Sequence, residues 1–246
     1  MRALAAAFRM LSRIPIPAPV TRREDMPASV AWFPFVGCVI GALVAGAFVS
    51  ASMLWPAGVA AVIAVAFGLL LTGGFHEDAV ADAADGFGGG IERERVLAIM
   101  RDSRIGTFGV LALWCVLSLR AVTLCALDEA ALWLLPAVYA WSRCAAPLLM
   151  LGLRPCSERG LASSMGKIAT WRIVLAVLIA CAAAAAVWHW GDHRAWRIAP
   201  AALIATCGWG IYLKRRMGGY SGDLLGTGIQ LAEAAALLAL LATPPS

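Results

Sequence analysis

The sequence predicts an all-α protein, a polytopic transmembrane helical bundle of about seven spans with an N-terminal interfacial helix. Three observations support this class. The chain has 246 residues, of which 61% are hydrophobic, and its mean hydropathy is +0.80. Only 14% of the residues are charged, whereas soluble domains carry about 25%. Apolar segments recur along the chain, each long enough to cross about 30 Å of hydrocarbon.

The expected spans are seven apolar segments: 30–54, 57–75, 106–127, 130–152, 170–190, 196–213 and 224–242. Segment 196–213 is short and 57–75 ends in glycines, so a re-entrant loop stays open for both. The opening string MRALAAAFRMLSRIPIP mixes arginines with apolar side chains, which is typical of a basic amphipathic helix in the membrane interface. We expect one integral membrane domain over 1–246, with an interfacial segment at 1–25, a cytoplasmic acidic catalytic loop at 73–105 and a cytoplasmic glycine-rich loop at 214–223.

The basic residues are distributed unevenly between the two sides of this predicted bundle. With seven spans, one side receives Arg2, Arg9, Arg13, Arg22, Arg23, Arg93, Arg95, Arg101, Arg104, Arg154, Arg159, Lys167, Arg172, Lys214, Arg215 and Arg216. The other side keeps Arg194 and Arg197. The positive-inside rule therefore predicts that the N-terminus and the acidic loop are cytoplasmic. The net charge of +5 suits anionic headgroups and soluble anions, and no nucleic-acid-binding motif accompanies it.

An acidic string, GGFHEDAVADAADGFGGG at residues 73–90, interrupts the apolar sequence at a predicted membrane boundary. Asp78, Asp82 and Asp85 are spaced i, i+4, i+7, which places them on one face of a helix. Like charges on one face repel unless a cation binds them, and carboxylate oxygens suit Mg²⁺. The alternative is a solvated helix whose carboxylates face water.

Two neighbouring strings favour a phosphate-containing substrate. The four glycines of GFGGG, residues 86–90, can end the helix and let backbone N–H groups approach an anion. In RDSRIGTFG, residues 101–109, Asp102 is a possible further metal ligand and Ser103 a possible donor. Arg101 and Arg104 could clamp phosphate oxygens, or they could simply mark the cytoplasmic side.

A third string, RRMGGYSGDLLGTGIQLAE at residues 215–233, opens the last predicted span. A helix N-terminus with exposed N–H groups suits phosphate, although Asp223 could instead be an ordinary first-turn acid. Gln230, Glu233 and Arg143 lie inside spans, where ionisable groups are functional candidates. Arg143 and Glu233 could alternatively form a structural ion pair. These residues indicate a membrane enzyme that holds Mg²⁺ on cytoplasmic carboxylates and acts on a phosphate-containing substrate.

The strings HEDAVADAADGFGGG and IMRDSRIGTFG, in this order, resemble the cobalamin synthase family, also called adenosylcobinamide-GDP ribazoletransferase. FRMLSRIPIP is similar to the usual opening of that family, and GGYSGDLLGTGIQLAE to its C-terminal motif. The chain departs from the family pattern at Ala79, where glycine is expected, and at Ala83, where threonine is usual. Neither change removes a ligand.

The resemblance implies a Mg²⁺-dependent enzyme of the prokaryotic cytoplasmic (inner) membrane. Adenosylcobinamide-GDP would react with α-ribazole or its 5′-phosphate and release GMP; an oligomeric state is not indicated. The implied catalytic residues are His76, Glu77, Asp82 and Asp85, with His76 or a carboxylate accepting the ribazole hydroxyl proton. The implied metal ligands are Glu77, Asp78, Asp82, Asp85, Asp102 and Asp223. The implied phosphate-binding residues are Gly88, Gly89, Gly90, Arg101, Ser103, Arg104, Gly219, Ser221 and Gly222.

Two alternatives stay open at this point. A CDP-alcohol phosphotransferase also uses an Asp-x-x-Asp-Gly pattern, which Asp82, Asp85 and Gly86 imitate. However, the Ala-Arg expected after the glycine is missing, and its fourth aspartate would fall on Gly106. A transporter could use Arg120, Arg143 and Glu233 along a membrane path, but the chain shows none of the repeated halves common in carriers.

Overall fold

The computed structural model describes residues 1–18, 20–22, 25–156, 165, 168–189 and 192–242. Its helices are α1 (Arg2–Leu11), α2 (Met26–Ser29), η2 (Val30–Trp32), α3 (Phe33–Ser52), α4 (Ala57–Thr72), α5 (Phe75–Gly89), α6 (Arg93–Ile99), α7 (Thr107–Ala126), α8 (Glu129–Leu132), α9 (Leu135–Arg143), α10 (Ala145–Gly152), α12 (Thr170–His189), η3 (His193–Arg197), α13 (Ile198–Arg216) and α14 (Gly222–Leu241). Over these ranges there is no β-strand, only an isolated bridge between Pro155 and Tyr220. Arg23, Arg159 and Lys167 lie outside the described residues.

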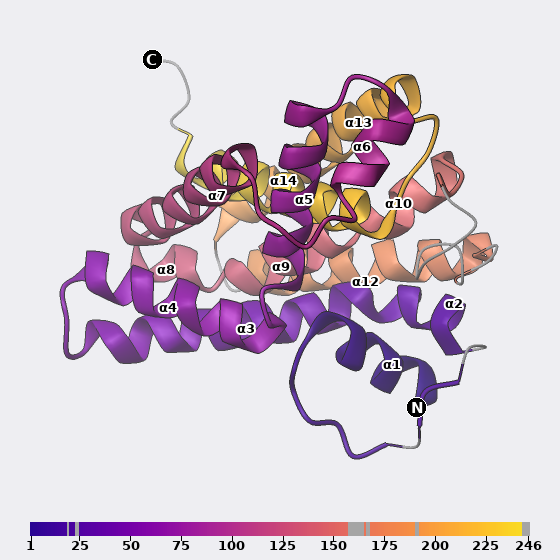
Figure 1. Cartoon of the computed structure of the whole chain (residues 1–246). Coiled ribbons are helices and arrows are strands. Elements are labelled where there is room, and N and C mark those ends of the chain that lie inside the picture. Colours follow the sequence, from indigo (N-terminus) through magenta and orange to yellow (C-terminus); the bar gives the residue numbers. More distant parts are fainter. Residues whose placement is uncertain (19, 23–24, 157–164, 166–167, 190–191, 243–246) are drawn as a thin grey trace.

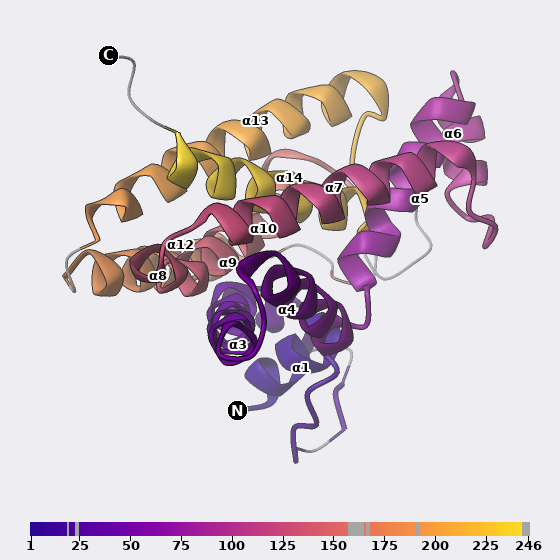
Figure 2. The same cartoon turned by 90° about the vertical axis from the view of Figure 1, so that its left-hand side faces the viewer.

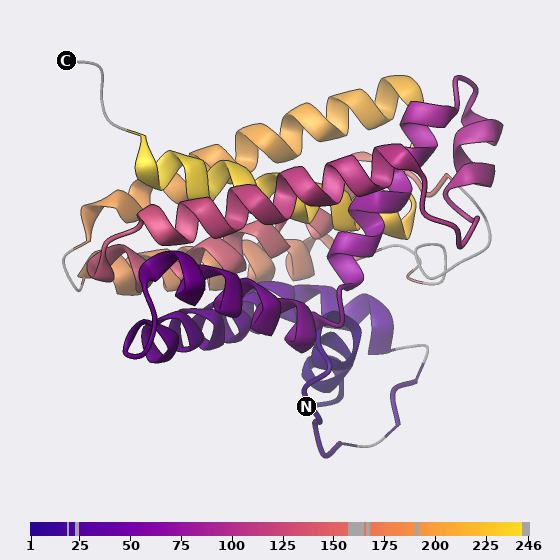
Figure 3. The same cartoon turned by 60° about the vertical axis from the view of Figure 1, so that its left-hand side comes forward.

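Long helices run side by side between two ends of the molecule (Figures 1 and 3). Within the described ranges, five stretches are long and apolar enough to cross a membrane: Met26–Ser52, Thr107–Ala126, Ala130–Gly152, Thr170–His189 and Gly222–Leu241. The predicted all-α polytopic bundle is therefore confirmed.

The number of spans differs from the predicted seven. Helix α4 has 16 residues, and the chain bends by 91° between α4 and α5, so that the two together form either one broken span or a re-entrant loop. Helix α13 ends in Lys214, Arg215 and Arg216. These charges leave it too polar to count as a span by composition. The described residues thus give five spans, or six with the bent pair.

One end of the bundle gathers the basic segments. Helices α1, α5 and α6 lie there with the turn between α13 and α14, whereas the α3–α4 and α7–α8 turns lie at the opposite end (Figure 3). Figure 2 shows the same separation between α5 and α6 at one end and the α7–α8 turn at the other. We call the first the basic end, because α6, the segment 101–104 and the last turn of α13 carry arginine or lysine. This arrangement agrees with the uneven charge distribution predicted from the sequence.

The centre of the bundle is a close contact between α3 and α9. Gly37 and Gly41 face the backbone of α9, and a Cβ atom at either would collide with the carbonyl oxygen of Tyr139 or Leu135. Small residues at this four-residue spacing let two membrane helices approach closely. The contact fixes α9, which carries Arg143 in the protein interior.

Helix α1 packs against α2 and α3 through one apolar face. Ala5, Ala6, Ala7, Phe8 and Leu11 are buried along that face, while Arg2 and Arg9 are exposed. The predicted amphipathic N-terminal helix is therefore present, and it lies at the basic end.

Candidate active site

The acidic string forms helix α5, which the structure fixes against α14. A Cβ atom at Gly226 of α14 would lie 2.7 Å from the Cβ of Ala79. Thr227 donates its hydroxyl to the carbonyl oxygen of Ala79 at 3.0 Å. The helix predicted from the spacing of Asp78, Asp82 and Asp85 is confirmed. Its small residues pack against the bundle, so part of its acidic face remains accessible.

A cavity of about 730 Å³ opens beside α5. Glu77, Asp78 and Asp82 line it, and Asp78 is exposed while Asp82 is partly buried. The remaining lining residues are Arg9, Met10, Ser12 and Arg13, the corner Thr72, Gly73, Gly74 and Phe75, and Ala81, Ser103, Ile105 and Leu113. The sequence interpretation assigned Arg9 and Arg13 to topology only and so missed them as site residues.

The cavity carboxylates fit a hard cation in part. Among the described residues, no three His, Cys, Asp or Glu side chains lie close enough together to hold one ion, so the six implied ligands do not form a single cluster. Mg²⁺ is usually bound by one or two carboxylates plus substrate phosphate oxygens. Asp78 and Asp82, one helical turn apart on the cavity wall, match that requirement. Asp82 also lies in the electrostatic field of the Asp78, Asp223 and Asp85 carboxylates, which a cation would relieve.

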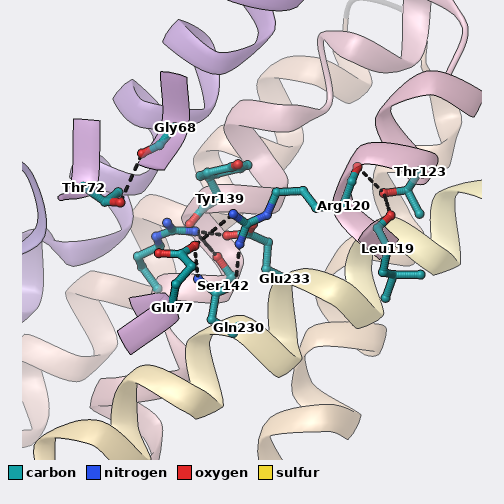
Figure 4. A network of polar contacts seen from close by, with 11 residues as sticks. Gly68, Thr72, Glu77, Leu119, Arg120, Thr123, Tyr139, Ser142, Gln230 and Glu233 are labelled. Carbon is teal, nitrogen blue, oxygen red and sulfur yellow. Dashed lines mark hydrogen bonds and ion pairs between the residues drawn. The ribbon is translucent and has the colours of Figure 1, made fainter. Parts of the chain in front are cut away.

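Glu77 points into the bundle (Figure 4), whereas its neighbour Asp78 is exposed. Its Oε1 accepts hydrogen bonds from Arg120 Nη1 at 2.9 Å and Gln230 Nε2 at 3.1 Å. Its Oε2 is buried without a hydrogen-bond partner in the described structure. Glu77 therefore belongs both to the cavity wall and to the protein interior.

Arg120 and Glu233 continue this contact through the bundle (Figure 4). Arg120 Nε lies 2.9 Å from Glu233 Oε1, and Arg143 forms an ion pair with Glu233 Oε2. Arg143 also stacks 4.5 Å from the centre of the Tyr139 ring. We call Glu77, Arg120, Arg143, Gln230 and Glu233 the buried charge network. It confirms the alternative in which Arg143 pairs with Glu233, and its two arginines balance its two glutamates.

His76 lies on another side of α5. It is 1% exposed, and neither ring nitrogen has a hydrogen-bond partner in the described structure. It borders a small apolar cavity with Phe33 and Leu225 rather than the large one. Its role as a proton acceptor stays a prediction, and the geometry places it away from the Asp78 and Asp82 side of the helix.

Asp85 contacts the start of α7. Its Oδ2 accepts the backbone N–H of Gly106 at 2.7 Å and its Oδ1 that of Gly109 at 2.8 Å. These are N–H groups that have no partner within their own helix, so Asp85 acts as a cap from another helix. A Cβ atom at Gly106 would lie 2.5 Å from Asp85 Oδ1, which explains this glycine. Asp85 does not line the large cavity, and its metal-binding role stays a prediction.

Within the segment 101–104, Arg104 and Asp102 form an ion pair with each other. Arg104 Nη2 donates to Asp102 Oδ2 at 2.7 Å and Arg104 Nε to Asp102 Oδ1 at 3.1 Å. These hydrogen bonds lower the pKa of Asp102 to about 2. Both side chains and that of Arg101 are exposed. Of the predicted phosphate-binding residues, Ser103 lines the large cavity.

The glycines after Asp85 serve close packing. Helix α5 continues through Gly89, and Gly90 donates its N–H to the carbonyl oxygen of Gly86 at 2.9 Å. A Cβ atom at Gly88 would collide with the ring of Phe108. Gly88, Gly89 and Gly90 do not line the large cavity, and their predicted contact with phosphate is not tested.

The residues at the start of α14 make contacts that stabilise the fold. Ser221 Oγ caps α14 by accepting the N–H of Leu224 at 3.3 Å. Gly219 lies against the carbonyl oxygen of Arg154, and Gly222 borders the small apolar cavity. Asp223 is near enough to Asp78 and Asp82 to act on them electrostatically. Further along α14, Gln230 donates to Glu77, a residue of the cavity wall.

A family model described as cobalamin-5-phosphate synthase matches residues 3–241. A protein of Leptothrix cholodnii named adenosylcobinamide-GDP ribazoletransferase is 39% identical over 261 residues, covering 96% of this chain and 93% of its own. Proteins with the same name from Rhizobium etli and Klebsiella pneumoniae subsp. pneumoniae are 38% and 39% identical, covering 96% and 98% of this chain and 95% and 100% of theirs. No solved structure matches the chain.

Proposed function

Because the chain belongs to the cobalamin-5-phosphate synthase family, a family of transferases, we propose that it joins adenosylcobinamide-GDP to α-ribazole or its 5′-phosphate. In this reaction the ribose hydroxyl attacks the phosphorus that carries the cobinamide. A new phosphorus–oxygen bond forms, the bond to the guanylate breaks, and GMP leaves. The observation that supports this most strongly is the large cavity, where carboxylates of α5 and arginines of the N-terminal segment face one space.

Asp78 and Asp82 are the residues that would hold Mg²⁺ in that cavity. When bound, the cation neutralises charge on the phosphate oxygens and aligns the diphosphate for displacement. The chain itself positions the acids. Gly226 and Thr227 of α14 hold α5 against the bundle, and Arg120 fixes the Glu77 side chain next to Asp78.

We assign the acceptor of the hydroxyl proton to a carboxylate of the cavity, either Glu77 or Asp82. Both line the space where the diphosphate would lie, whereas His76 borders the other cavity. A general base must lie within hydrogen-bond reach of the proton it accepts. This geometric requirement favours the carboxylates over the imidazole.

We further propose that the basic end faces the cytoplasm and that the membrane is the inner membrane. The support is the gathering of arginine and lysine in segments at that end (Figure 3), which the positive-inside rule associates with the cytoplasmic side. The substrates, which are soluble anions, would then enter from the cytoplasm.

The two alternatives from the sequence gain no support. The transporter alternative rested on Arg120, Arg143 and Glu233, and these are buried and paired with one another. The CDP-alcohol phosphotransferase alternative rested on a partial motif, whereas the family match to cobalamin-5-phosphate synthase covers residues 3–241.

The test is a reconstituted reaction. Purified protein in detergent is mixed with adenosylcobinamide-GDP, Mg²⁺ and either α-ribazole or its 5′-phosphate, and the corrinoid product and GMP are separated by chromatography. We expect equal amounts of both products with at least one acceptor, and loss of turnover when Mg²⁺ is chelated. Absence of GMP with both acceptors would reject the proposed reaction, and turnover unaffected by chelation would reject the role of Mg²⁺.

A further inference from the structure

Arg13 lies on the wall of the large cavity, although it precedes the first residue of the acidic helix, Phe75, by 62 positions in the sequence. The chain leaves α1 at Leu11, turns at Ser12, and the backbone N–H of Arg13 donates to the carbonyl oxygen of Leu71 at 2.7 Å. The N-terminal segment is therefore fixed to the last turn of α4, just before the corner that leads into α5.

The corner itself is shaped around the Arg13 side chain. Gly73 ends α4 with a φ of +69°, a left-handed conformation that favours glycine. A Cβ atom at Gly73 would collide with Nε of Arg13. The glycine thus serves two purposes, because it turns the chain and it leaves room for the guanidinium to lie against the corner.

The guanidinium of Arg13 is exposed, and it has neither an ion pair nor a hydrogen bond to any of the described residues. This differs from its neighbour Arg9, which donates to Thr21 Oγ1 at 3.0 Å and to the carbonyl oxygens of Ile16 and Ala18. It also differs from Arg104, which is occupied by Asp102. Arg13 shares a cavity with Asp78 and Asp82 and yet forms no ion pair with them.

An unpaired arginine and unpaired carboxylates around one space suit a ligand that carries charges of both signs. A phosphate group bound to a divalent cation has this character, since the cation satisfies the carboxylates and the outer oxygens satisfy the arginine. Resting on the proposed function, we propose that Arg13 is a substrate-binding residue that donates hydrogen bonds to a phosphate oxygen of the substrate's diphosphate. The N-terminal segment then forms part of the active site as well as a contact with the membrane.

The same chemistry could be supplied by the phosphate of an anionic lipid headgroup, because Arg13 follows an amphipathic helix. The position of Arg13 inside a cavity with Asp78 and Asp82 favours the soluble diphosphate, since a diphosphate offers two anionic groups to a cation held by the carboxylates, whereas a lipid phosphodiester offers one. The two sources make different experimental predictions.

The test compares full-length Arg13→Ala and Arg13→Lys with wild type, and with Arg2→Ala as the matched control. Arg2 is an exposed arginine of the same segment that does not line the cavity. The first measurement is equilibrium binding of Mg²⁺–GDP in lipid-free detergent by calorimetry. We expect Arg13→Ala to weaken binding about 10- to 100-fold, the range for a hydrogen bond to a charged group. Arg13→Lys keeps the charge but loses the planar fork, so an intermediate loss is expected, and Arg2→Ala should bind as wild type does.

The second measurement is the KM for adenosylcobinamide-GDP, which should rise in the same order among the variants. If Arg13→Ala does not fold, the same two measurements on Arg13→Lys test the proposal. Binding of Mg²⁺–GDP unchanged in a folded Arg13 variant would overturn the proposal. The proposal would also be overturned if the Arg13 variants bound Mg²⁺–GDP normally but floated less with vesicles of anionic lipid. That result would show that Arg13 binds a lipid headgroup. If wild type binds Mg²⁺–GDP through Arg13 but gives no corrinoid product, the proposed function fails while the role of Arg13 stands.

Discussion

Glu77 and Asp78 are adjacent in sequence, and their carboxylates lie in opposite environments. Glu77 is 7% exposed and is bound by Arg120 and Gln230. Asp78 is exposed, on the wall of a cavity that no described residue fills. Successive residues of a helix are rotated by about 100°, so a single turn of α5 directs Glu77 toward the buried charge network and Asp78 toward the large cavity, which Glu77 also borders.

The difference shows two uses of charge in one helix. In the buried charge network each carboxylate has an arginine, and removing one partner would leave a buried charge uncompensated. In the large cavity the acids lie near other acids, and the nearby Arg13 is not paired with them. The first arrangement fixes the position of α5, and the second is suited to an external cation and anion. The following experiments separate the two uses, from the largest expected effect to the smallest.

Glu233→Gln should have the largest effect, on stability. The change leaves Arg120 and Arg143 with only Glu77 to balance them. Breaking a buried ion pair from one side costs about 3–5 kcal/mol, so we expect a loss of that size in the free energy of unfolding, measured by denaturant titration in detergent. Glu94→Gln, an exposed change on α6, is the matched control. Equal stability of the two variants would show that the network does not hold the fold.

Asp82→Asn should have its effect on turnover. The side chain lines the large cavity and takes no part in the buried charge network. We expect kcat to fall about 10²- to 10³-fold, as when an electrostatic contact to the transition state is removed. The free energy of unfolding should stay within about 0.5 kcal/mol of wild type. Near-normal kcat in a folded Asp82→Asn protein would contradict the assignment of the acidic wall.

Asp85→Asn tests a residue that belongs neither to the buried charge network nor to the wall of the large cavity. An amide can accept only one of the two N–H bonds now made by Gly106 and Gly109. We expect a loss of about 1 kcal/mol in unfolding free energy, typical of a lost helix cap, with faster amide hydrogen exchange at the start of α7. A fall in kcat as large as that of Asp82→Asn with no loss of stability would instead establish Asp85 as a metal ligand.

Arg104→Ala should have the smallest effect. Its side chain is 87% exposed and is paired with Asp102 in solvent, and such pairs contribute little. We expect kcat/KM for adenosylcobinamide-GDP to change less than about threefold. A loss of tenfold or more would show that Arg104 contacts the phosphate oxygens of the substrate, as the sequence interpretation proposed.

Much of the fold follows from patterns that are local in the sequence. Apolar length predicts the helices, and the i, i+4, i+7 spacing predicts α5. The interior position of Glu77 was not predicted, because the resemblance placed Glu77 among the catalytic residues and metal ligands. A signal for it was available, since Glu77 lies one residue before Asp78 and therefore off the face that the aspartates share. The pairing of Arg143 with Glu233 was one of two alternatives, because buried charges of opposite sign require partners.

What the sequence does not contain is contact between distant segments. Nothing near Arg13 indicates that its guanidinium lies against Gly73, and nothing near Asp85 indicates that it caps α7 at Gly106. Glycines and charges have several possible uses, and tertiary packing selects among them. Gly88 is an example, since a string typical of an anion-binding turn here allows close contact with Phe108. The difference between the predicted and observed number of spans has the same cause, because the bend between α4 and α5 depends on tertiary packing at the corner that joins them.

The most direct test of the central claim is the binding of Mn²⁺, in place of Mg²⁺, to the protein in the presence of GDP, followed by electron paramagnetic resonance. We expect wild type and Glu94→Gln to bind the ion with equal affinity. The Asp78→Asn/Asp82→Asn double variant should bind it at least tenfold more weakly while keeping its stability. If the folded double variant binds Mn²⁺ as wild type does, the carboxylates of the large cavity are not the cation site and the proposed use of α5 is wrong.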